Sequence, residues 1–136
     1  MKVRFAVLTD YSNITQEGKL NILGLFDFIY AVQFPAAHHE MQLVMRFEAD
    51  ISERGQQKEV QVRLIDERGE QILELNGRMT IGDAKPGDLL FFNQVLTLRN
   101  VVFPREGDYG FDIYVDGFRQ FHVPLKVVVP PVQHKT

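Results

Sequence analysis

The chain has 136 residues, of which 45% are hydrophobic and 24% charged, and its formal net charge is −3. This is the size and composition of one soluble globular domain. The absence of cysteine excludes disulfides, thiolate chemistry and cysteine-based zinc sites. The Lys and Arg residues are scattered and form no run that would follow a phosphate backbone, so we expect no nucleic-acid binding.

The hydropathy pattern predicts neither a signal peptide nor a membrane span. The apolar stretch near the start covers only residues 5–8, which is shorter than the apolar region of a signal peptide. The most apolar region, residues 20–34, is interrupted by polar side chains and is too short for a transmembrane helix. We therefore expect a cytoplasmic protein that does not insert into membranes.

Apolar and polar residues alternate along most of the chain, as in β-strands with one face toward a core. The clearest case is the run 41–49, in which every odd-numbered residue is apolar. We expect about eight strands, near residues 3–11, 19–27, 28–34, 41–50, 58–66, 71–81, 89–99 and 109–129. The last is a hairpin that can count as two strands, and the stretch 28–34 can also continue 19–27 beyond a bend.

Regular turns between these runs predict an all-β fold, namely an antiparallel β-sandwich of immunoglobulin-like type. Residues 1–129 are expected to form a single sandwich domain. Residues 130–136 are expected to form a C-terminal tail, because Pro130-Pro131 cannot continue a strand.

Two turn signals define the last hairpin. Asp116-Gly117 separates two alternating runs by two residues, which predicts a tight turn with positive φ at both positions. Tyr109 follows Gly107-Asp108 and opens a strand, like the corner tyrosine of immunoglobulin-like sandwiches, whose hydroxyl bonds to nearby backbone. We expect Tyr109 to have a structural role.

Two segments, residues 22–30 and 89–96, are apolar on both faces and must be covered on both. One interpretation is a central strand that lies partly under a long loop. The other is a partner surface, most simply a homodimer interface. The sequence leaves both interpretations open.

No convergent set of polar residues marks a catalytic centre. His38-His39-Glu40 follows Pro35 in a predicted loop, but adjacent side chains of an extended segment point to opposite faces, which disfavours a metal site. His122 is expected on the polar face of the last strand, as a surface residue rather than a base. Neither Ser12 nor Ser52 lies in a nucleophile elbow. We therefore expect a non-catalytic protein without a cofactor or bound metal.

A calcium site is the weakest of the binding hypotheses. Asp83 and Asp88, with Asp66, Asp108 or Asp116, could in principle surround a calcium ion, which takes roughly six to eight oxygen ligands. The paired Asp-x-Asp loops of calcium-dependent membrane-binding sandwiches are absent from the sequence. Asp83 and Asp88 are expected to stabilise their own turn instead.

Two stretches carry turn and core motifs that can be compared with known families. The first is FAVLTDY at residues 5–11 with GKLNILGLFD at 18–27. The second is VFP at 102–104 and GDY at 107–109, leading to VDG at 115–117 and PLKV at 124–127. Together they resemble, over nearly the whole chain, a family of small bacterial proteins of unknown function. The second stretch also resembles the final hairpin of immunoglobulin-like modules. The resemblance implies no activity and no functional residue.

These observations favour a non-catalytic protein-interaction module that acts through an apolar sheet face or an edge strand, as a homo-oligomer or with another protein. The candidate residues are Phe91, Val95 and Tyr114. Phe91 and Val95 share a face opposite Phe92 and Leu96, and Tyr114 is an aromatic residue on a polar face. The competing interpretation is that all three are covered core residues.

Two further hypotheses follow from the same pattern. Pro124 cannot donate a ladder hydrogen bond, which predicts that the last strand is bulged or lies at an edge. An exposed edge can accept a partner's strand. The alternative function is a small-ligand or carbohydrate-binding β-sandwich, although such sites often use Trp, which is absent here.

Overall fold

The computed structural model describes residues 1–82 and 90–131. Its strands are β1 (Lys2–Ile14), β2 (Leu20–Phe26), β3 (Phe28–Tyr30), β4 (Ala36–Ala49), β5 (Gln57–Asp66), β6 (Gln71–Thr80), β7 (Leu90–Phe103), β8 (Gly107–Val115) and β9 (Phe118–Val128). A 3-10 turn, Ile51–Glu53, follows β4. Among the described residues, no helix is long and apolar enough to cross a membrane.

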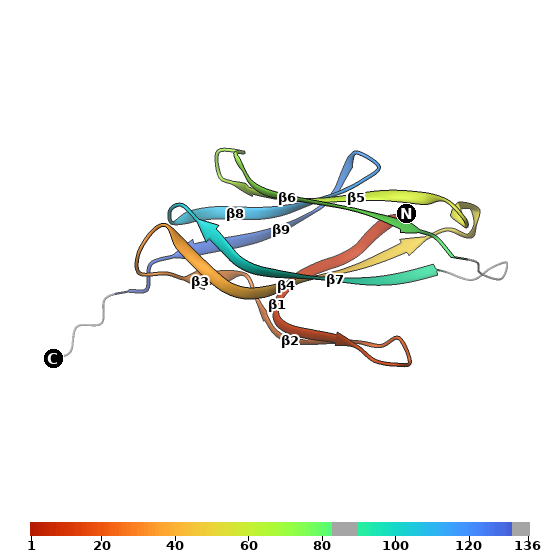
Figure 1. Cartoon of the computed structure of the whole chain (residues 1–136), viewed down its shortest axis with the longest axis horizontal. Coiled ribbons are helices and arrows are strands. Elements are labelled where there is room, and N and C mark those ends of the chain that lie inside the picture. Colours follow the sequence, from red (N-terminus) through yellow and green to blue (C-terminus); the bar gives the residue numbers. More distant parts are fainter. Residues whose placement is uncertain (83–89, 132–136) are drawn as a thin grey trace.

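The strands form two sheets packed face to face, which confirms the predicted sandwich (Figure 1). The first sheet has four strands in the order β2-β1-β4-β7, and the second has five in the order β3-β9-β8-β5-β6. Alternate residues of the central strands fill the space between the sheets, as the period of two predicts. Met41, Leu43 and Phe47 of β4 and Phe111 and Ile113 of β8 are completely buried there.

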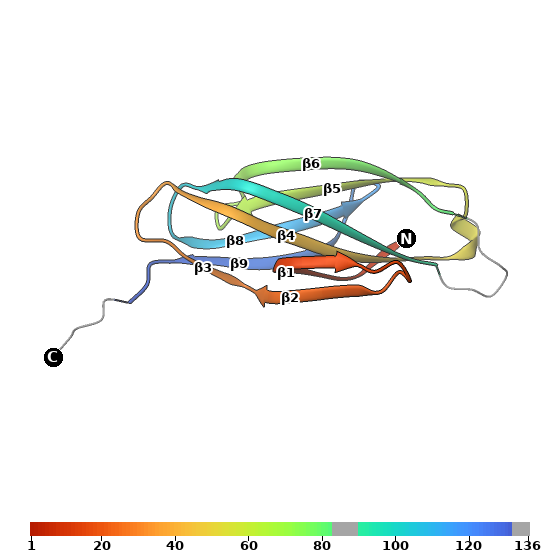
Figure 2. The ribbon, with the colours of Figure 1, turned by 60° about the horizontal axis from the view of Figure 1, so that its bottom comes forward.

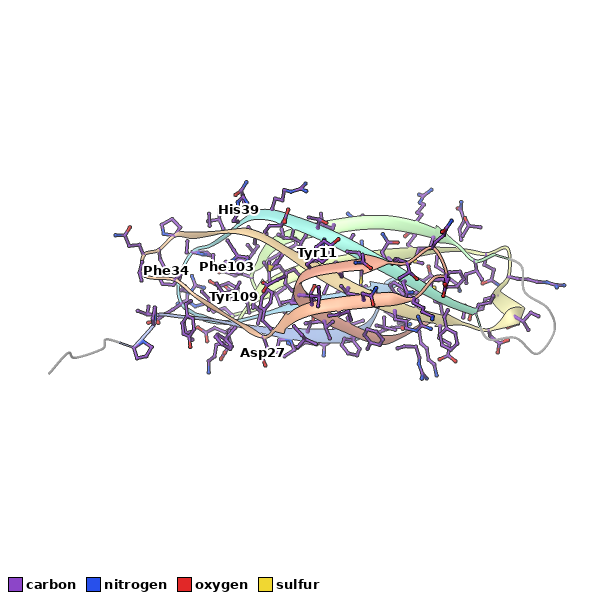
Figure 3. All side chains as sticks on the ribbon, turned by 90° about the horizontal axis from the view of Figure 1, so that it is seen from below. Tyr11, Asp27, Phe34, His39, Phe103 and Tyr109 are labelled. Carbon is purple, nitrogen blue, oxygen red and sulfur yellow. The ribbon has the colours of Figure 1, made fainter. Side chains whose placement is uncertain are left out.

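The hairpin formed by the second half of β1 and by β2 crosses the outer side of the first sheet. β1 pairs with β4 through residues 2–9 and with β2 through residues 8–14. The Ser12 hydroxyl donates a hydrogen bond to Gln42 on β4 (2.6 Å), and Asn93 on β7 donates to the Gly18 carbonyl at the hairpin tip (3.4 Å). The hairpin lies below β4 and β7 in Figure 1 and in front of them in Figure 3. Val44 therefore has no exposed surface, although it points away from the core.

The structure corrects the sequence interpretation at β3. The stretch 28–34 contains only a three-residue strand, and this strand belongs to the second sheet, whereas β2 belongs to the first. β3 lies beside the end of β9 and runs parallel to it, with Phe28 opposite Lys126 and Tyr30 opposite Val128 (Figure 2). The sandwich is therefore antiparallel except for this pair.

The prediction that His38-His39-Glu40 lies in a loop was wrong. β4 begins at Ala36, and His38 is paired with Val101 of β7. β7 in turn continues to Phe103, beyond the predicted end at residue 99. Asn100 has a positive φ of 54°, which interrupts the alternation of side chains there. The ladder with β4 nevertheless continues past it.

Both turn predictions for the last hairpin are confirmed. Asp116 and Gly117 have φ values of 51° and 82°, as a type I′ turn requires. The Tyr109 hydroxyl donates to the Arg105 carbonyl at 2.6 Å, and the Arg105 N–H donates to the Tyr109 hydroxyl oxygen at 3.4 Å. Tyr109 packs edge-on against Phe103, with ring centres 5.0 Å apart (Figure 3).

Candidate functional site

The structure brings two of the three predicted surface residues together. Phe91 and Val95 lie on the outer side of β7, whereas Phe92 and Leu96 pack against the core, as the alternation predicts. Phe91 is 40% exposed with the Arg46 guanidinium 4.6 Å from its ring centre, and Val95 is half-buried.

Tyr114 belongs to a different surface. It lies on β8 in the second sheet, where its ring is half-buried beneath the Arg63 guanidinium at 4.5 Å. Its neighbours in the strand, Ile113 and Val115, point into the core, so Tyr114 faces outward from the second sheet. It therefore cannot share a binding surface with Phe91 and Val95, which face outward from the first.

β7 is an edge strand with unusual composition. Its ladder with β4 runs from Leu90 to Phe103, and within residues 1–82 and 90–131 no strand pairs with its other side. There is no charged residue and no proline from Leu90 to Leu98. Soluble proteins normally protect sheet edges with charges, prolines, bulges or short strands, because a free edge presents unpaired N–H and C=O groups.

The other edges are protected in this way. β2 contains Gly24, whose φ is +71°, and β3 has three residues. β6 carries Glu74 and Arg78 in its middle. β2 is uncharged like the first part of β7, but the positive φ of Gly24 interrupts it, so the segment from Leu90 to Leu98 is the longest uninterrupted uncharged edge of the described part of the chain.

Pro124 predicted that the last strand is bulged or lies at an edge. β9 confirms this in the part before Lys126, where its pairing with β3 begins. Its ladder with β8 shifts by one residue between Ile113 and Tyr114, which is a bulge. The side chain of Gln120 accepts from the N–H of Val3 and donates to the carbonyl of Met1, at 3.1 and 3.0 Å. The start of β1 thus covers this edge.

The free edges of β6 and β7 lie at the same side of the sandwich. A hollow of about 110 Å³ between them is lined mainly by apolar side chains, among them Leu75 and Met79 of β6 and Leu96 of β7. Gln94 is exposed at its rim. A strand placed along β7 would therefore also contact apolar side chains of the second sheet.

The segment 22–30 is covered on one side only. Ile22 and Phe26 are half-buried, whereas Leu23 and Leu25 are 61% and 62% exposed. Tyr11, which pairs with Leu23 across the hairpin, is 52% exposed. The segment is therefore not a fully covered central strand, because only the inner face of the hairpin packs on the sheet. The outer face is exposed, which leaves the interpretation as a partner surface open.

A second hollow, of about 480 Å³, lies on the outer face of the second sheet where β3, β9 and β8 meet. Phe28 and Tyr30 of β3 form one wall, with ring centres 5.0 Å apart in an edge-to-face arrangement. Pro124 and His122 of β9 line the opposite part. Because the hollow needs the parallel pairing of β3 with β9, it could not be found from the sequence.

A histidine–aspartate pair extends into this second hollow. His122 Nδ1 lies 2.6 Å from Asp112 Oδ1, and the Asp112 side chain is 4% exposed with Arg119 3.8 Å away. The ring lies over Gly110, where a Cβ atom would collide with it. From the sequence, His122 was expected to be a surface residue without a partner. A regular two-residue hairpin would place Phe121 opposite Asp112, and the bulge moves His122 there instead.

Asp66 and His38 are two of the titratable groups outside the hollows whose pKa values are shifted. Burial would raise the pKa of Asp66, but the hydrogen bonds from the N–H groups of Glu70 and Arg68 and the nearby Arg105 guanidinium lower it. Burial lowers the pKa of His38, whose Nε2 is enclosed without a hydrogen-bond partner among the described residues.

Two of the acidic residues considered for calcium are bound to other groups of the protein. Asp66 binds Arg105, and Asp116 contacts Lys58 and the N–H of Glu59. Asp83 and Asp88 lie outside the described residues. In the part of the chain that the structure describes, no group of three or more His, Asp or Glu side chains is placed to hold a metal ion.

Comparison with known proteins identifies a family but no function. Residues 4–128 match a model described as a family of unknown function, DUF6941. No curated protein matches the chain. The function must therefore be inferred from the geometry of the sandwich itself.

Proposed function

Because the chain belongs to this family of unknown function, we propose a function from its own geometry: it is a non-catalytic protein-interaction module that pairs with a second copy through the free edge of β7. The observation that carries the proposal is the uncharged edge from Leu90 to Leu98. Strand addition to such an edge uses main-chain hydrogen bonds for affinity and alternate side chains for specificity.

A second copy is the partner that fits this edge best. An antiparallel pair of identical strands is related by a two-fold axis, so the same surface is used on both copies. With the axis at Gln94, Phe92 would face the partner's Leu96 and Leu90 would face the partner's Leu98. The apolar inner row of β7 would then continue across the junction, and no charge would be buried.

The outer side of the same strand supports this arrangement. Phe91 would lie opposite the partner's Thr97, and Val95 would lie close to the axis. The pairing would join two four-stranded sheets into one continuous sheet. This assigns Phe91 and Val95 to the interface and leaves Tyr114 outside it.

The finer features of the proposal have indirect support. An immunoglobulin-like relationship is supported by the Tyr109 corner and by the final hairpin. A cytoplasmic location fits the absence of cysteine, and a bacterial origin rests on the resemblance of the turn and core motifs alone.

Gln94→Lys tests the proposal. Light scattering coupled to size-exclusion chromatography is expected to give a mass near twice 15.7 kDa for the natural protein at high concentration. Gln94→Lys should give a monomer, because two lysines would meet at the axis beside an apolar hollow. Gln33→Lys, the same change at an exposed position between β3 and β4, should leave the dimer intact. A natural protein that stays monomeric, or a Gln94→Lys variant that still dimerises, would contradict the proposal.

The absence of cysteine offers a test of register. Gln94→Cys places one thiol per chain beside the proposed axis, where opposed Cα atoms of an antiparallel pair lie about 4.5–5.5 Å apart. Mild oxidation should give a covalent dimer, whereas Gln33→Cys should not. Equal cross-linking of the two variants would show that the register is wrong.

A further inference from the structure

We propose that the hollow between β3, β8 and β9 is a binding site for a neutral pyranose sugar. This site lies on the outer face of the second sheet, and β7 is the far edge strand of the first. The inference therefore does not depend on the pairing of β7. The volume of the hollow, about 480 Å³, lies within the usual range of small-ligand sites, roughly 300–1,000 Å³.

The aromatic wall is held rigidly in place. Ile29 is buried in the core and its pairing with Val127 fixes β3, so the side chains on either side of it must point outward. These are Phe28 and Tyr30, which are 45% and 57% exposed. Because the two rings meet edge to face, they form an apolar corner, and the C–H face of a pyranose ring can stack on one ring while it contacts the other.

The charged side chains around this wall suit a neutral ligand with many hydroxyls. Asp27 lies at the junction of β2 and β3 (Figure 3), and Asp108 and Lys126 are opposite each other on β8 and β9. The carboxylates can accept hydrogen bonds from hydroxyl groups and the ammonium can donate to them. Because both signs of charge are present, a strongly charged ligand would be opposed by one of them.

His122 adds an oriented polar group. Its Nδ1 is held 2.6 Å from Asp112 Oδ1, which leaves Nε2 as the ring nitrogen that can exchange a hydrogen bond with a hydroxyl group of a ligand. Nε2 makes no hydrogen bond to the described residues. Gly110 leaves room for the ring to lie flat in the hollow. The orientation is thus set by a buried partner before any ligand binds.

The test is an NMR titration of the full chain with methyl β-glucopyranoside, methyl β-galactopyranoside and N-acetylglucosamine. At least one sugar is expected to shift backbone amides of residues 27–30, 108–110 and 122–128. Tyr30→Ala should weaken that binding about tenfold, because it removes one of the two rings of the aromatic wall. Tyr11→Ala removes a similarly exposed tyrosine from the β1–β2 hairpin and should leave the affinity unchanged.

A second variant tests the role of the histidine. Gly110→Ala keeps an ordinary extended backbone but displaces the His122 ring, and it should also weaken binding. Amide spectra of each variant report whether the fold is retained. The proposal is overturned if none of the three sugars shifts these amides, if the shifts lie elsewhere, or if Tyr30→Ala binds as well as the natural protein.

Discussion

Removal of the Tyr109 hydroxyl measures how much the corner between β7 and β8 contributes to stability. Tyr109→Phe deletes the 2.6 Å hydrogen bond to the Arg105 carbonyl and keeps the ring, which is 4% exposed and packs on Phe103. Such a hydrogen bond contributes about 1 kcal/mol to the free energy of unfolding. Its loss costs up to about 2 kcal/mol where the carbonyl left without a donor is partly shielded from water. Arg105 is half-buried, so we expect a loss of about 1–2 kcal/mol.

Thermal unfolding followed by circular dichroism can resolve this loss. For a chain of this size, 1 kcal/mol corresponds to roughly 3–5 °C in Tm. Tyr114→Phe is the matched control, because the Tyr114 hydroxyl makes no hydrogen bond to the described residues and its ring contact with Arg63 is kept. That change should cost less than about 0.5 kcal/mol. If the Tm values of the two variants fall equally, or Tyr109→Phe has no effect, the corner does not stabilise the fold as argued.

Two further predictions concern pH. Because the folded-state pKa of Asp66 is lowered by the N–H groups of Glu70 and Arg68 and by Arg105, its contribution is present above about pH 4 and is lost as the pH falls through the folded pKa. Unfolding measured at several pH values should show that Asp66→Asn has a lower free energy of unfolding than the natural protein near neutrality and loses less of it on acidification. Equal pH dependence of the two free energies would argue against this role. Burial lowers the folded-state pKa of His38 below 6.5, so the natural protein should lose stability as the pH falls from 6.5. His38→Phe should remove that loss. If the variant and the natural protein lose the same stability between pH 7 and pH 5, the prediction is wrong.

Much of the fold was predictable from side-chain alternation. The run 41–49 shows its buried face directly, since each inward residue is apolar. The Asp116-Gly117 turn requires positive φ at both positions, so two residues were enough to predict the last hairpin. In both cases the signal is local and comes from the side chains themselves.

Features that depend on backbone pairing between distant segments left no such signal. The residues around His38 show no alternation, and only the ladder with β7 makes them a strand. The parallel pairing of β3 with β9 joins segments almost a hundred residues apart. The second hollow depends on that pairing.

The candidate sites were predictable to different extents. The outward direction of Phe91 and Val95 follows from the alternation of β7, but the sequence does not show that β7 is an edge strand. The contact between His122 and Asp112 depends on a one-residue bulge in the last hairpin. A regular register would pair Asp112 with Phe121 and place His122 on the opposite face of the sheet, so the pair was missed.

Hydrogen–deuterium exchange of β7 as a function of protein concentration tests the proposed pairing most directly. If β7 pairs with a second copy, peptides covering residues 90–98 should become more protected as the concentration rises through the dimerisation range. Peptides from β6 and from the β1–β2 hairpin should change much less. Protection of residues 90–98 that does not depend on concentration, while light scattering shows a dimer, would place the interface elsewhere and contradict the account.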